Sequence, residues 1–99
     1  MRMFDILRSA TQQKIGVEIK KNTIYFFYDN EILAIETLVD ATNPKHEKWN
    51  CELYDGEDII NLAEGTKEDI AKQCIQHSIK KRTEMEKRKK FGTIPSKTF

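Results

Sequence analysis

The sequence predicts an α+β fold. An antiparallel β-meander of four to five strands follows a short N-terminal element and precedes a long C-terminal helix packed on one face. Apolar residues alternate with polar ones from Lys14 onward, tight-turn dipeptides separate the alternating runs, and a helical apolar stripe begins near Thr66. We expect the basic end of this helix to project from the body of the protein.

The N-terminal element spans residues 3–12, where Phe4, Leu7 and Ala10 recur at helical spacing. A short helix is expected, and a strand that begins at Met3 is the alternative.

The first two predicted strands differ in pattern. Ile15, Val17 and Ile19 alternate with polar residues, as expected of a half-buried strand. Residues 23–28 are apolar on both faces and rich in aromatic and β-branched side chains. We therefore place this second strand at the centre of the sheet, with something covering each side.

The third and fourth strands alternate again. In the third strand one face is apolar and Glu36 points the other way; the fourth strand follows the polar loop 40–47. The residues of these two faces are Leu33, Ile35, Thr37 and Val39, then Trp49, Cys51 and Leu53.

Tight turns are predicted at Lys21-Asn22, Asp29-Asn30 and Asp55-Gly56, and the last has the strongest hairpin signal. Residues 57–63 fit either the return strand of this hairpin or a short helix ended by Gly65. The strand is preferred, because the Asp-Gly pair lies directly between two apolar runs.

The C-terminal helix begins with a capping box at Thr66–Asp69. Its apolar stripe stops after Ile79, so we expect the first half to pack on the sheet and residues 80–91 to project. Residues 1–91 are expected to form one domain and residues 92–99 a flexible tail. The stripe consists of Ile70, Ala71, Cys74, Ile75, Ser78 and Ile79.

Composition narrows the class of protein. The 99 residues are 38% hydrophobic and 33% charged, no run approaches the roughly 20 apolar residues of a membrane span, and no secretory signal is present. Two cysteines are too few for a disulfide framework. We expect a soluble cytoplasmic protein with reduced thiols and no contact with membranes.

Charge is divided unevenly along the chain. Residues 1–79 carry nine Lys/Arg and fourteen Asp/Glu, a net charge of −5, whereas residues 80–99 carry eight and two, a net charge of +6. Such asymmetry is typical of an interaction segment. The predicted partner-binding residues are Lys80, Lys81, Arg82, Lys87, Arg88, Lys89 and Lys90.

Two histidines and two cysteines are weak candidates for a metal site: His46, Cys51, Cys74 and His77. Their spacing differs from that of zinc modules, and both cysteines fall on predicted core faces, so no metal is expected. The chain contains no phosphate loop, nucleophile elbow or zinc-protease motif. We therefore expect neither a cofactor nor catalytic residues.

The aromatic run at residues 25–28 could stack single-stranded bases on an open sheet, but its neighbours are acidic and core packing explains it better. Our leading hypothesis is a small non-catalytic regulatory module that binds another protein, one with an acidic surface, through the basic helix. The alternative is nucleic-acid binding through residues 80–90, and the third hypothesis is an enzyme with an unrecognised site. A homodimer, with the basic tail of one copy on the acidic sheet of another, is compatible with the same charges.

Overall fold

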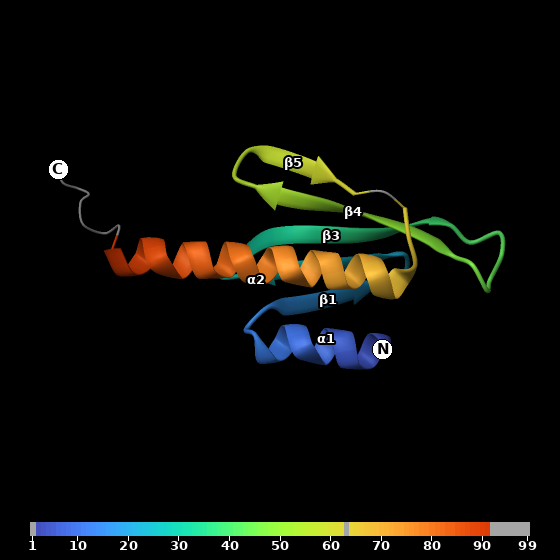
Figure 1. Ribbon diagram of the computed structural model, residues 1–99, viewed down its shortest axis with the longest axis horizontal. Coiled ribbons are helices and arrows are strands. Elements are labelled where there is room, and N and C mark those ends of the chain that lie inside the picture. Colours follow the sequence, from blue (N-terminus) through green and yellow to red (C-terminus); the bar gives the residue numbers. More distant parts are fainter. Residues whose placement is uncertain (1, 63, 92–99) are drawn as a thin grey trace.

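The computed structural model describes residues 2–62 and 64–91, and its α+β architecture is the expected one. Five strands lie between a short and a long helix (Figure 1). In chain order the elements are α1 (Met3–Gln12), β1 (Gly16–Lys20), β2 (Thr23–Tyr28), β3 (Glu31–Asp40), β4 (Lys48–Asp55), β5 (Asp58–Asn61) and α2 (Lys67–Phe91).

The strands form one antiparallel sheet in the order β1-β2-β3-β4-β5, so every strand pairs with its neighbour in sequence. Short turns make this meander possible. Asp29 and Asn30 both have positive φ, at 53° and 65°, which is the backbone of a two-residue hairpin turn. Gly56 has φ 63° in the β4–β5 turn, and β5 confirms the strand preferred for this segment.

Both helices lie on one side of the sheet. Helix α2 packs across β2, β3 and β4, and α1 lies beside α2 next to β1 (Figure 1). Helix α1 confirms the helix expected for its segment and buries Ile6 and Ala10 in the core between the layers. The protein therefore has two layers, with one face of the sheet covered and the other left to solvent or partners.

The start of α2 is capped as expected. Thr66 Oγ1 accepts a hydrogen bond from the backbone N–H of Asp69 at 3.1 Å, which satisfies one of the free N–H groups of the first turn. The expected stripe is buried except for its last member, Ile79, which is partly buried against the core.

The expectation for β2 was wrong in two respects. It is the second strand of five and β3 is the central one, and only one of its faces is covered by a helix. Ile24 and Phe26 are buried beneath α2, whereas Tyr25 and Phe27 lie on the opposite face. One helix layer cannot cover both faces, so the second set of aromatic rings stays half-exposed.

The expectation for β3 was reversed. Glu36 is fully buried on the face that α2 covers, together with Ala34, whereas Ile35 and Thr37 lie on the open face. Leu33 is buried too, because the β2–β3 register shifts between Phe26 and Phe27 and leaves Leu33 as an extra residue.

The docked part of α2 extends beyond the expected boundary at Ile79. Met85 packs against the core, and residues 81–86 are all partly buried. Projection begins in the following turn, where Lys87 and Arg88 are exposed and α2 runs past the end of the sheet (Figure 1). Polar contacts, which the apolar stripe could not reveal, hold the extra turns in place.

Candidate functional site on the open face of the sheet

The four candidate metal ligands do not come together. Cys51 and Cys74 meet beneath α2, where their side chains share a hydrogen bond. His77 Nε2 lies 2.7 Å from the carbonyl oxygen of Tyr54, and His46 is in the β3–β4 loop. Within residues 2–62 and 64–91, no three His, Cys, Asp or Glu side chains form a group that could hold a metal ion.

The thiol pair lies next to a buried carboxyl group. Glu36 is directly opposite Cys51 in the β3–β4 register and is 0% exposed. Neither carboxyl oxygen has a hydrogen-bond partner among the described residues. Burial raises the pKa of Glu36 to about 8, the sulfur of Cys51 and the charge of Glu68 add to this rise, and Lys67 opposes it.

This cluster is closed to substrates. Both thiols are at most 1% exposed, and the hydrogen bond to Cys51 together with burial raises the pKa of the Cys74 thiol far above its usual range. A nucleophilic cysteine needs an accessible thiolate and a base within reach. The arrangement favours a structural core in which Glu36 is neutral at neutral pH.

The five predicted basic residues whose side chains are described, Lys80, Lys81, Arg82, Lys87 and Arg88, divide into two groups. Lys81 Nζ forms ion pairs with Asp55 at 2.5 Å and with Glu84 at 2.9 Å, and Arg82 is also engaged within the fold. Lys80, Lys87 and Arg88 are the exposed members. The side chains of Lys89 and Lys90 lie outside the described part of the chain.

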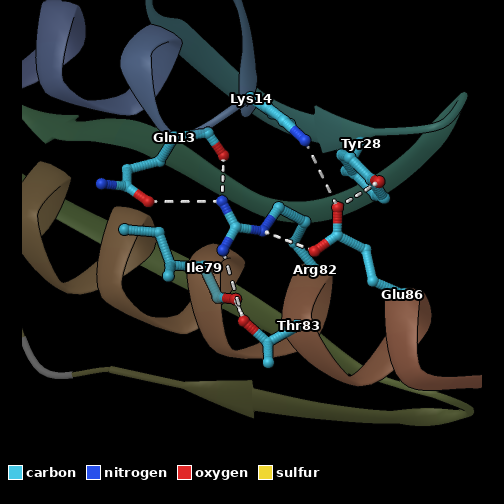
Figure 2. A network of polar contacts seen from close by, with 7 residues as sticks. All are labelled: Gln13, Lys14, Tyr28, Ile79, Arg82, Thr83 and Glu86. Atoms are coloured by element: carbon cyan, nitrogen blue, oxygen red, sulfur yellow. Dashed lines mark hydrogen bonds and ion pairs between the residues drawn. The ribbon is translucent and has the colours of Figure 1, made fainter.

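Arg82 is the centre of a polar clasp, shown in Figure 2. Its guanidinium donates to the backbone oxygen of Gln13 at 2.5 Å, and its Nε lies 3.6 Å from Glu86. The same Glu86 accepts a hydrogen bond from the Tyr28 hydroxyl at 3.1 Å and lies 3.8 Å from Lys14 Nζ. The clasp therefore ties α2 to the end of α1 and to β2.

A groove of about 510 Å³ lies between the β3–β4 loop and the start of α2. Lys45, Lys48 and Lys67 line it together with His46 and with Glu47, Glu64 and Glu68, so side chains of both charges are mixed in its wall. Trp49 Nε1 donates to Glu47 at its edge. This mixture of charges selects no ligand class.

The open face of the sheet has a more distinct composition. Near the β2–β3 and β4–β5 turns, two cross-strand pairs of side chains lie on this face, and Ile32 of one pair and Tyr54 of the other line the same hollow. We call the row that the two pairs form the transverse band: Phe27, Ile32, Tyr54 and Ile59. The registers pair Phe27 with Ile32 and Tyr54 with Ile59, and alternation places all four opposite the buried Phe26, Leu33 and Leu53. Every member of this row is apolar or aromatic.

The transverse band is accessible. Ile32 is 44% exposed and Ile59 51% exposed, while Phe27 and Tyr54 are half-buried. Phe27 lies over Gly16 of β1, where an added Cβ would be 2.5 Å from the ring. Because Gly16 has no side chain, the Phe27 ring can lie flat over β1, and the apolar surface of the band extends onto that strand.

The rows beside the band become progressively more polar. The adjacent row places Tyr25 and Ile35 between Glu18 and Glu52, and the next consists of Lys20, Thr23, Thr37 and Asn50. A shallow hollow of about 240 Å³ is lined by Phe27 and Ile32 of the band together with Glu18, Lys20 and Tyr25. Lys20 approaches Glu18 at 3.4 Å and the Tyr25 ring at 5.9 Å.

Sequence reasoning missed this band because of one residue. Strict alternation grouped Leu33 with Ile35 on one face, and without the bulge Ile32 would lie on the same side as the buried Ala34 and Glu36. The β-bulge instead buries Leu33 and turns Ile32 outward beside Phe27. The aromatic run at residues 25–28 was a usable signal, although it was interpreted as core on both faces.

No helix among the described residues is both long enough and apolar enough to span a bilayer. A scan against protein-family models found no match, and searches of curated proteins and of solved structures found none either.

Proposed function

We propose that this protein is a small non-catalytic module that binds another protein, and that the transverse band is its main contact surface. The observation that carries the proposal is an apolar row on a sheet face that neither described helix covers. Exposed contiguous apolar side chains with a polar surround are typical of protein–protein interfaces.

The basic end of α2 is the second contact element in this proposal, in a smaller form than the sequence predicted. Lys81 and Arg82 are used in ion pairs and hydrogen bonds within the fold, so Lys80, Lys87 and Arg88 remain for a partner among the described side chains. The band supplies apolar area that loses its water on binding. The helix end supplies charge, which raises the association rate and orients the partner.

Nucleic-acid binding through the same helix end is the second candidate, because Lys87 and Arg88 are exposed beyond the sheet. Phosphate contacts would make such binding strongly salt-dependent. The aromatic open face adds little support, since Glu18 and Glu52 flank its rings and would repel a phosphate backbone.

The test is affinity purification of the full chain from its native lysate after nuclease treatment, with three forms compared. We expect a stoichiometric protein partner with the wild type and its loss with Ile32→Asp combined with Ile59→Asp. Val39→Asp is the matched control, since Val39 is 45% exposed on the same sheet but outside the band. Equal recovery with the band variant would overturn the proposal.

The nucleic-acid candidate needs a separate measurement. Lys87→Glu with Arg88→Glu should abolish retention of DNA and RNA at low salt, and the band variant should not affect it. If the wild type retains no nucleic acid at low salt, this candidate is excluded.

A further inference from the structure

The two contact elements of this chain are complementary to each other. The transverse band has glutamates along its border: Glu18 and Glu52 lie in the neighbouring row, and Glu57 lies in the β4–β5 turn beside Ile59. The projecting end of α2 exposes Lys87 and Arg88. The apolar, acid-bordered surface and the cationic element that fits it therefore occur on one molecule.

We propose that two copies of this chain form a reciprocal dimer, in which the basic end of each α2 lies on the transverse band of the other. This inference rests on the proposed function, because it takes the band to be a docking surface, and it names a second copy as the occupant. Each copy uses both of its elements, so the contact closes on itself as a two-fold dimer.

The placement of the two elements allows this exchange. Helix α2 runs past the sheet at the end where the β2–β3 and β4–β5 turns lie (Figure 1). The band crosses that same end on the opposite face, and a hollow lined by Met85, Arg88, Ile32 and Tyr54 lies where the helix passes it. In its own copy the helix end lies on the α2 side of the sheet, so Arg88 borders Ile32 and Tyr54 at this edge without lying across the open face.

In this dimer the two-fold axis lies in the plane of the sheet, perpendicular to the strands and just beyond these turns. With the axis there, the helix end of each copy reaches the band of the other. Rotation about this axis turns the second copy over, so its open face comes to the side on which the first copy carries α2. The two sheets then lie end to end, with each helix end above the open face of the other copy. Antiparallel helices on opposite sides of the dimer avoid contact between the two basic ends.

Charge favours this arrangement over other contacts between copies. Residues 1–79 have a net charge of −5, so two bodies brought together without the helices would repel. In the reciprocal dimer Lys87 and Arg88 of each copy approach Glu52 and Glu57 of the other. Because these groups are exposed, the attraction is screened by salt and the dimer should weaken as ionic strength rises.

Charge reversal on each element tests the pairing directly by analytical ultracentrifugation, from micromolar to millimolar concentration. The wild type should be a salt-sensitive dimer. The helix variant, Lys87→Glu with Arg88→Glu, and the band variant, Glu52→Lys with Glu57→Lys, should each weaken self-association at least roughly tenfold, the change that 1.4 kcal/mol produces.

Mixing the two variants gives the decisive result. The unreversed helix of the band variant meets the unreversed band of the helix variant, and the two reversed elements also attract each other. An equimolar mixture should therefore form a heterodimer of near wild-type affinity. Asp5→Lys with Glu64→Lys, a charge change of equal size at exposed positions away from both elements, should leave the wild-type dimer intact.

Circular dichroism must first show that each variant is folded. A monomeric wild type at millimolar concentration, or a mixture that stays monomeric, overturns the reciprocal dimer. A wild-type dimer that is indifferent to both charge reversals overturns it as well. If the wild type is monomeric but the Ile32→Asp and Ile59→Asp variant loses its partner, only this inference fails; if the dimer forms and that variant keeps its partner, only the proposed function fails.

Discussion

Glu36 on β3 lies directly opposite Cys51 on β4, on the sheet face that α2 covers, and its carboxyl group is completely buried. A third group, the Cys74 thiol, reaches the same place from the helix and shares a hydrogen bond with Cys51. The carboxyl oxygens lack hydrogen-bond partners among the described residues, so its charged form would be very costly there. The layer between helix and sheet is therefore built around an uncharged acid.

Stability should fall as pH rises, because of Glu36. Its pKa is about 8 in the folded protein against 4.5 in the unfolded chain, so below pH 4.5 both states hold the proton. Between pH 4.5 and 8 the unfolded state loses it first, which lowers the free energy of unfolding by on the order of 3–5 kcal/mol in total. Glu36→Gln should remove this slope and be more stable than wild type at pH 8.

The check is urea denaturation of wild type and Glu36→Gln at several pH values from 5 to 8. The titratable groups that act on Glu36 are Cys51, Lys67, Glu68 and Cys74, and both proteins retain them. Glu52→Gln on the open face is the control and should follow the wild-type slope. Parallel curves for wild type and Glu36→Gln would contradict a neutral buried carboxyl.

Neither thiol should react in the folded protein. Cys51 is 1% exposed and Cys74 is 0% exposed, and the raised pKa of Cys74 keeps its thiol protonated. A disulfide reagent should modify both cysteines at the rate at which the protein unfolds, and both at once in urea. Fast labelling of one cysteine in buffer, measured by absorbance and mass, would show that the cluster opens locally.

Arg82→Ala should destabilise the protein by about 1–3 kcal/mol, because it removes the charge-assisted bonds to Gln13 and leaves Glu86 with only the more distant, exposed Lys14 as its cation. The Arg82 side chain is only 16% exposed, so screening by water is limited. Arg88→Ala, at an exposed position six residues later, should change stability by less than about 0.5 kcal/mol. Thermal unfolding measures the loss of stability in each variant. Equal losses would show that the contacts of Arg82 in the clasp do not stabilise the fold.

Gly16→Ala should displace the Phe27 ring. The new Cβ would lie 2.5 Å from Cε2 of that ring, which must swing away from β1. Because the ring is the free end of a side chain on the open face, we expect a modest cost of about 1 kcal/mol together with altered ring chemical shifts in NMR spectra. At Gly65 an added Cβ would meet Ile70 at an ordinary 3.4 Å, so Gly65→Ala should leave the Phe27 signals unchanged.

The elements that the sequence predicted correctly depend on local chemistry. The Asp29-Asn30 turn, the Thr66 cap and the buried stripe from Ile70 to Ser78 follow from nearby residues and helical or strand periodicity. The Asp-Gly signal located the β4–β5 hairpin, although its two-residue loop is Gly56-Glu57 and Asp55 is the last residue of β4. The preferred strand after Gly56 was confirmed for the same reason. Each depends on contacts within a few positions of the chain.

The candidate site was predicted less accurately from the sequence than the fold was. Lys87 and Arg88 are exposed as predicted, but Lys81 and Arg82 are bound to Asp55 and Gln13. Those contacts join residues 26 and 69 positions apart, which no local pattern reveals.

By itself the sequence determined the order of strands and helices, the turns between them and the division of charge, because these are set by neighbouring side chains and by composition. Only the tertiary structure decided which side of each strand faces α2. Alternation defines two faces without saying which one a helix will cover, and a single bulge at Leu33 exchanges them. That choice buried Glu36 beside two thiols and left Phe27, Ile32, Tyr54 and Ile59 in one exposed row.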